Sequence, residues 1–269
     1  MNALSARAES IGERWGLTPG TIDWSTAIAA TDAAPSINGA RPWRFLVRPD
    51  AVELHADWRR APGSADPTGR DARIAGGAAL FTMQTALRAA GIEPRITLLP
   101  NAAHPTLLAT VQPGGHRPPS AQETALYRAV THRHPYPTRP DAVSEAALLD
   151  IEDAAAAEGG FLRVVTDPPT AAAIAELVRR LEHRQGRGRP SRWSPPLIGV
   201  LLSAGDTPRH HLRVGQALQR ALLTATDHGV AVSVVGAPAD LPLASAWLQV
   251  MIDTVLWPQL VLRFGSVAG

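Results

Sequence analysis

Apolar and polar positions follow two periods along the chain, one typical of helices and one typical of strands. Small and apolar residues at helical spacing predict helices over 24–33, 71–90, 121–130, 143–157, 169–182, 208–228 and 239–252, after a helical lead-in over 1–23. Shorter runs rich in apolar and β-branched residues predict strands over 44–47, 52–55, 96–99, 107–111, 161–166, 197–202, 230–235 and 259–264. The first two strands follow each other without an intervening helix, which favours an α+β fold over a doubly wound parallel sheet.

One pattern of small and apolar residues occurs twice at a constant offset. The matching pairs are Gly77 with Gly215, Ala79 with Ala217, Leu80 with Leu218 and Gly91 with Gly229. A period this long does not fit a solenoid, so it indicates two fused and related halves. A cleft between such halves would imitate a dimer interface inside one chain, and ligand sites favour such clefts. We expect an N-terminal half over 1–115 and a C-terminal half over 116–269, joined by the Pro- and Gly-rich segment 112–120.

Composition narrows the class of protein. The 269 residues are 45% hydrophobic, which is enough for a large core. No stretch reaches the roughly 18 apolar residues of a membrane span, and the N-terminus lacks the apolar segment of a secretory signal. The absence of cysteine excludes disulfides and thiolate chemistry. We therefore expect a cytoplasmic protein without a membrane partner, and the net charge of +2 gives no reason to expect nucleic acid.

All 26 basic residues are arginine, and the chain contains no lysine. This excludes a Walker lysine, a Schiff-base lysine and a lysine general base. Any bound anion must be held by arginine, by hydroxyl groups or by backbone amides. The paired histidines at 132 and 134 and at 210 and 211 lack the spacing of a metal site and have no regularly placed carboxylates, so no metal is expected.

Four segments carry a family resemblance. They are Ala34-Pro-Ser-Ile-Asn-Gly-Ala-Arg-Pro-Trp-Arg-Phe45, Asp66-Pro-Thr-Gly-Arg70, Gly76-Gly-Ala-Ala-Leu80 and Pro258-Gln-Leu-Val-Leu-Arg-Phe-Gly265. Together they resemble the nitroreductase family, and within it the fused, two-lobed actinobacterial Acg branch. The resemblance implies a nitroreductase-like α+β fold of two fused pseudo-symmetric halves, each with a mainly antiparallel sheet and helices. It also implies that FMN binds between the halves. Because the two halves are fused in one chain, we expect either a monomer that contains a pseudo-dimer or a homodimer.

The resemblance assigns cofactor contacts to three stretches of the chain. It places a turn against the flavin ring, a hydroxyl and a cation at the FMN phosphate, and a loop along the pyrimidine side of the flavin. The residues of the turn are Pro35, Ser36 and Ile37, with Asn38 and Arg41 beside them. Those of the phosphate site are Thr131 and Arg133, and the adjacent Arg128 is a further candidate cation. Those of the loop are Val234, Val235 and Gly236. Arginine and hydroxyl donors suit a phosphate, which is consistent with the second assignment.

The activity implied is that of an FMN-dependent oxidoreductase, which reduces a small conjugated or nitro-type acceptor with NAD(P)H as electron donor. The sequence departs from the family pattern at Gly39, where the pattern has asparagine, at Arg41, where it has glutamine, and at Ala129, where it has the first arginine of the phosphate motif. It also ends four residues after Gly265, where relatives continue into a basic tail. These departures keep two alternatives open: a flavin-binding or flavin-sequestering protein, and a degenerate scaffold with altered or lost flavin binding. No side chain stands out as a proton donor, and His132 is the weak candidate.

Overall fold

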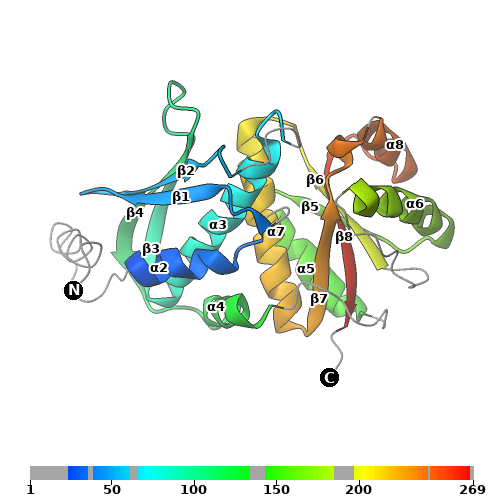
Figure 1. The fold of residues 1–269 in the computed structure, drawn as a ribbon. Coiled ribbons are helices and arrows are strands. Elements are labelled where there is room, and N and C mark those ends of the chain that lie inside the picture. Colours follow the sequence, from blue (N-terminus) through cyan, green and yellow to red (C-terminus); the bar gives the residue numbers. More distant parts are fainter. Residues whose placement is uncertain are drawn as a thin grey trace. The chain divides into compact units, whose positions relative to one another are not determined.

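The computed structural model describes residues 24–35, 39–60, 66–133, 143–184, 197–241 and 243–266, apart from the side chains of residues 182 and 184. The chain divides into two compact units, Met1–Thr131 and His132–Gly269. Each unit contains one four-stranded antiparallel sheet together with helices (Figure 1). The α+β class predicted from the sequence is therefore confirmed. No helix among the described residues combines the length and the hydropathy that a bilayer crossing requires.

The first unit is built around a long helix and the sheet on which it packs. Its elements are α2 (Trp24–Ala30), η1 (Thr31–Ala33), β1 (Trp43–Val47), β2 (Val52–Ala56), α3 (Arg70–Ala89), β3 (Ile92–Leu98), β4 (Leu107–His116) and α4 (Ala121–His132). The strand order is β1-β2-β4-β3, and α3 packs on the sheet and on α2. Along β3, buried positions give way to half-buried and exposed ones, so part of this edge strand stays open to solvent.

The second unit has the same strand order and additional helices. Its elements are α5 (Glu145–Ala156), β5 (Phe161–Val165), α6 (Pro168–Arg184), β6 (Leu197–Ser203), α7 (Pro208–Asp227), β7 (Val230–Gly236), η3 (Pro238–Asp240), α8 (Ala244–Met251) and β8 (Trp257–Ser266). The strands follow the order β5-β6-β8-β7, which matches the order in the first unit.

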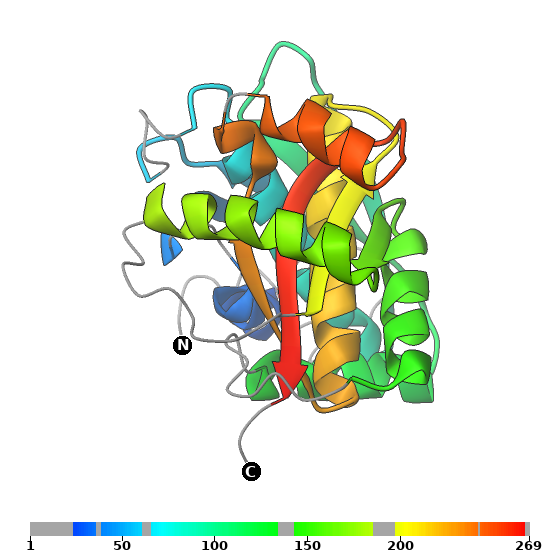
Figure 2. The ribbon, with the colours of Figure 1, turned by 90° about the vertical axis from the view of Figure 1, so that its right-hand side faces the viewer.

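Helices cover the second sheet on both faces. Helix α7 packs on one face with α5 beside it, and α6 crosses the opposite face (Figure 2). Strands β6, β7 and β8 are accordingly buried at nearly every position instead of at alternate ones. Continuous apolar runs are expected where a sheet has no solvent-facing side.

The repeated residues occupy the same structural positions in the two units. Helices α3 and α7 both contain 20 residues, and each is followed after two residues by a seven-residue strand. Gly91 and Gly229 lie in the two helix–strand turns with φ angles of 80° and 68°. These left-handed conformations explain why glycine is present in both copies. The two-half interpretation is consistent with this correspondence.

The segment 112–120 differs from the predicted linker. Strand β4 continues to His116 and pairs with β3 through Gln112 and Pro113. The glycines that suggested a linker permit this pairing instead: a Cβ atom on Gly114 would lie 2.5 Å from the carbonyl oxygen of Glu93. The boundary between the compact units lies after Thr131, near the end of α4.

Arg117, just beyond β4, joins three elements of the first unit. Its Nε donates to Glu93 Oε2 at 2.9 Å and its Nη1 donates to Glu123 Oε2 at 2.8 Å. Glu123 also forms a reciprocal capping box with Ser120 at the start of α4, with bonds of 2.8 Å and 3.1 Å. The Arg117 hydrogen bonds lower the pKa of Glu123 to about 2 from its ordinary value of 4.5.

Replacing Glu123 with alanine should lower the free energy of unfolding of the first unit by about 1 kcal/mol near neutral pH, because the cap and the ion pair are lost. Because the pKa of Glu123 is lowered in the folded state, its contribution to the free energy of unfolding is complete above pH 4.5 and disappears as the pH falls towards 2. The variant should therefore lose less stability than the natural chain over this interval. Urea unfolding at several pH values measures this, with exposed Gln122→Ala as control; parallel pH profiles would contradict the prediction.

Candidate functional site

The turn after η1 holds the first group of predicted cofactor residues. Pro35 is half-buried and follows Ala34, whose backbone is extended (φ −65°, ψ 142°). The residue before a proline avoids the helical region, which is why the helix ends here. Ser36, Ile37 and Asn38 lie outside the described residues, so their assignment stays a prediction.

Arg41 lies at the other end of this turn in a left-handed conformation, with φ of 44°. Its Nη1 is 3.2 Å from Asp32 Oδ1, and half of its side chain is exposed (50%). The next two residues fix the start of β1, because Trp43 is buried and its amide donates to the Arg41 carbonyl oxygen at 2.8 Å. The turn thus carries an exposed ion pair, whose partner Asp32 was not identified from the sequence. Exposed ion pairs are weak, so a ligand anion could compete with Asp32 for the guanidinium.

The end of α4 holds the predicted phosphate donors. Arg128 and Thr131 are exposed and one turn apart, and the Thr131 hydroxyl donates to the Arg128 carbonyl oxygen at 3.3 Å. Arg133 follows the last helical residue and is half-buried, with its Nε inaccessible to solvent. Ala129, at the position of the family's first arginine, is buried. A helix C-terminus disfavours anions, so among the described residues the two guanidinium groups and the hydroxyl are the groups that could attract a phosphate to this end.

Residues Val234, Val235 and Gly236 lie where β7 ends. The pairing of β7 with β8 shifts register between Val234 and Gly236, which marks a β-bulge. Bulges of this kind are frequent next to binding sites because they redirect the backbone. The side chain of Val235 belongs to the hydrophobic core, so a ligand contact by this residue would have to use its backbone.

A polar network in the second unit, buried at Gln259, Ser203 and His211 and exposed at Asp206, was not predicted from the sequence. Gln259 Nε2 donates to Ser203 Oγ at 2.9 Å and to Asp206 Oδ1 at 3.0 Å, and His211 Nε2 lies 2.7 Å from the same Asp206 oxygen. His210 Nδ1 contacts Thr207 Oγ1 at 2.7 Å. The histidine pair thus has protein partners, and the described residues contain no group of three or more potential metal ligands. The network ties β6 and β8 to the start of α7.

Replacing Gln259 with leucine should lower the free energy of unfolding of the second unit by about 1–3 kcal/mol, because a buried donor to two oxygen atoms is lost while the volume is nearly conserved. Native-state hydrogen exchange of β6 and β8 peptides measures the effect. Gln122→Leu, at an exposed position, provides the matched control. Equal protection in the two variants would show that the network contributes nothing.

Comparisons with known proteins find distant sequence relatives over most of the chain. No protein-family model matches the sequence. Two Mycobacterium tuberculosis proteins, from strains CDC 1551 / Oshkosh and ATCC 25618 / H37Rv, are named "Putative NAD(P)H nitroreductase". Each is 27% identical to this chain over an alignment of 294 positions, gaps included, that covers 89% of this chain and 84% of the relative.

Solved structures match about half of the chain. A Bacteroides thetaiotaomicron protein described as a "Putative NADH dehydrogenase/NAD(P)H nitroreductase" is 13% identical, with a TM-score of 0.44, over 54% of this chain and 88% of that chain. A nitroreductase with bound FMN from Bacteroides fragilis is 15% identical, with a TM-score of 0.43, over 53% and 88% of the two chains. By sequence, the chain is similar over 89% of its length to two distant relatives named "Putative NAD(P)H nitroreductase".

Proposed function

We propose that this protein is an FMN-dependent oxidoreductase that uses NAD(P)H to reduce a small conjugated or nitro-type acceptor. The observation that carries the proposal is the 27% identity to the two mycobacterial relatives, because it extends over 89% of this chain instead of one short motif. The equivalent strand order of the two units supports it, since the family resemblance implies two similar halves.

The residues at the end of α4 fit an FMN phosphate chemically. Arg128 and Arg133 supply two guanidinium groups and Thr131 supplies a hydroxyl, and such groups bind phosphate through charge-assisted hydrogen bonds. Pro35 and the bulge at Val234–Gly236 would position the ring through packing and backbone contacts. Bound FMN would supply the redox chemistry, whereas the protein would supply binding and orientation.

The direct test is the absorbance spectrum of the purified protein. The proposal expects the bands of oxidised flavin, either as purified or after incubation with FMN and gel filtration. It also expects these bands to bleach when NADPH or NADH is added without oxygen, and to return when a nitroaromatic or quinone acceptor follows. A protein that binds FMN but is reduced by neither nucleotide contradicts the enzymatic proposal.

Replacing Arg133 with alanine should weaken FMN binding by on the order of 2–3 kcal/mol, because a half-buried charge-assisted contact to the phosphate is lost. Fluorescence quenching of FMN on titration with protein measures the dissociation constant. Arg179→Ala is the matched control, since Arg179 is exposed and pairs with Glu176 on α6. An unchanged dissociation constant for Arg133→Ala would remove this residue from the site.

The Arg41–Asp32 ion pair favours a second candidate function, a flavin-binding protein with little turnover. The resemblance places a neutral glutamine where this chain has Arg41, so the turn carries an additional positive charge balanced by Asp32. A changed charge near the ring would alter the ease of flavin reduction while leaving binding intact. Stable FMN binding without reduction by NADPH or NADH would select this candidate, and absence of FMN binding would reject both.

A further inference from the structure

The second unit contains a groove formed by two insertions that the described part of the first unit lacks. Residues 48–51 form the short connection between β1 and β2, whereas the equivalent connection between β5 and β6 contains α6. Likewise, residues 99–106 join β3 to β4, whereas η3 and α8 lie between β7 and β8. The groove lies between these two additions, α6 and α8, and has a volume of about 340 Å³. Such a volume is in the range of small-molecule sites.

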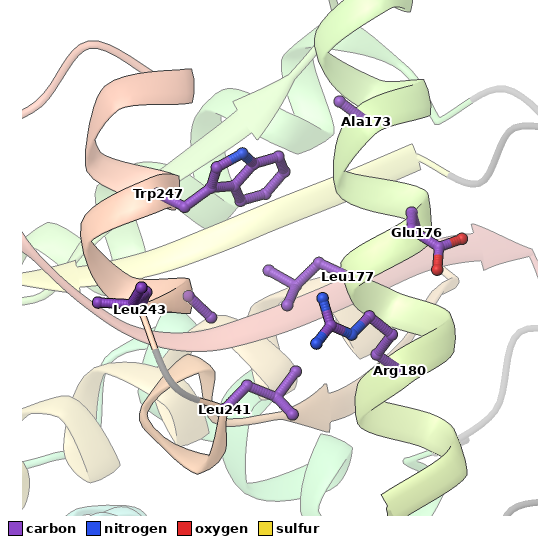
Figure 3. A pocket seen from close by; sticks show the side chains of 8 residues that line it. Ala173, Glu176, Leu177, Arg180, Leu241, Leu243 and Trp247 are labelled. Carbon is purple, nitrogen blue, oxygen red and sulfur yellow. The ribbon is translucent and has the colours of Figure 1, made fainter.

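The walls of the groove are mostly apolar. They are formed by Leu177 of α6, Leu241 and Leu243 before α8, and Trp247 of α8 (Figure 3). Trp247 is 37% exposed and Leu243 is 83% exposed, so large apolar surfaces remain in contact with water. Below them lies the core cluster that includes Leu177 and Leu248, so the groove has a rigid floor. An apolar wall that remains hydrated gains free energy when an apolar ligand covers it.

Leu243 is also held in an unfavourable backbone conformation, with φ of 61° and ψ of −2°. A branched side chain disfavours the left-handed region, and residues in such conformations concentrate at binding sites. The strain is not compensated by burial, because the Leu243 side chain is the most solvent-accessible of the groove residues quoted above. The conformation therefore presents an apolar side chain at the rim of the groove.

Arg180 gives the groove its charge. Its guanidinium group lies between Leu177 and Leu241 and is directed towards α8 (Figure 3). Glu176 also lines the groove, but its carboxylate is directed away from α8 (Figure 3) and pairs with Arg179. Within the described part of the chain Arg180 has no ion-pair partner, so the uncompensated charge in the groove is positive. A cation beside an exposed indole and three leucine side chains is complementary to an anion with an apolar body.

We propose that the groove between α6 and α8 binds an amphipathic organic anion, in which an aromatic or other apolar body lies against Trp247 and Leu243 and a carboxylate pairs with Arg180. This site is independent of the proposed flavin function. Its elements belong to the second unit alone, and none of the predicted FMN contacts lies on α6 or α8.

The test uses 2-naphthoate as the anionic probe and 2-naphthamide as its neutral analogue, with the full-length protein and excess FMN present to occupy any flavin site. Binding is followed by the indole N–H signals of the seven tryptophans in a ¹⁵N-correlated spectrum. Trp247→Phe identifies the Trp247 signal. We expect naphthoate to shift this signal and to bind about tenfold more tightly than naphthamide.

Arg180→Gln should abolish the preference for naphthoate and weaken its binding about tenfold. Arg179→Gln is the matched control, because its guanidinium is already paired with Glu176, and it should bind naphthoate as the natural chain does. Equal affinity for the two probes, a Trp247 signal unaffected by naphthoate, or unchanged binding by Arg180→Gln would each overturn the proposal. So would concentration-dependent self-association that buries Trp247 and that naphthoate does not reverse, since the groove would then be a protein interface.

Discussion

Replacing Phe264 with alanine should lower the free energy of unfolding of the second unit by about 3–5 kcal/mol. Phe264 is 1% exposed and lies on β8, an inner strand of the sheet, opposite Leu197 of β6 and Val232 of β7. Its ring occupies the space beside Gly199, where a Cβ atom would lie 2.7 Å from Phe264 Cε2. Alanine would leave a cavity beneath the helices that cover this sheet, and the surrounding strands cannot collapse fully into it.

Native-state hydrogen exchange reports this loss through peptides of β6 and β8, which should exchange only by opening of the unit. Phe161→Ala is the matched control, because Phe161 is 43% exposed on the edge strand β5. It should change the same free energy by less than about 1 kcal/mol. Similar losses for the two variants would mean that Phe264 is not a core residue.

Gly199 provides an independent check on this packing. Gly199→Ala should be destabilising alone, by about 1–3 kcal/mol, because the new methyl group overlaps the Phe264 ring. Phe264→Leu replaces the ring with a smaller side chain. In that background, Gly199→Ala should lower the free energy of unfolding by less than it does alone. Strictly additive effects would indicate that the two side chains do not share this space.

Replacing Gly114 with alanine should lower the free energy of unfolding of the first unit by about 3 kcal/mol. The obstacle is backbone: the new Cβ atom would lie 2.5 Å from the Glu93 carbonyl oxygen on β3. The pairing of β3 and β4 shifts register between Ile92 and Pro94, so the ladder is already irregular at this point. A side chain could rotate away, whereas here the strands must separate and lose hydrogen bonds.

The neighbouring glycine is a matched control for this prediction. A Cβ atom on Gly115 would have no atom within 4 Å, and its φ angle is outside the left-handed region. Gly115→Ala should therefore change stability by no more than about 0.5 kcal/mol. Hydrogen exchange of β3 and β4 peptides distinguishes the two variants, and equal behaviour would contradict the close approach at Gly114.

Much of the secondary structure follows from local patterns in the sequence. The predicted helices 71–90 and 208–228 correspond to α3 (Arg70–Ala89) and α7 (Pro208–Asp227), because small and apolar residues recur at helical spacing over long stretches. Strands were predicted where β-branched residues cluster, as in β7 (Val230–Gly236), but the predicted ends of the strands were less accurate. Strand β3 begins at Ile92 instead of 96, since Pro94 is tolerated on an edge strand and conceals the pattern.

The candidate site likewise has features that the sequence predicts and features that depend on the folded structure. The residue types at 128, 131 and 133 indicate anion chemistry because guanidinium and hydroxyl groups are strong donors wherever they occur. Which partners they have depends on folding: Arg41 pairs with Asp32, and Thr131 donates to the Arg128 carbonyl oxygen. The hydrogen bonds of Gln259 could not be predicted from the sequence, because its two acceptors are more than fifty residues away along the chain.

The sequence by itself determined the α+β class, the position of the repeated helix and strand, and the absence of lysine from any anion site, since these depend on local periodicity, on spacing along the chain and on composition. Only the tertiary structure decided that 112–116 continues a strand, that α6 and α8 are additions of the second unit, and that Arg180 lies beside Trp247. Pairing, burial and charge neutralisation depend on residues that are distant in the chain, and local patterns do not specify which of them meet.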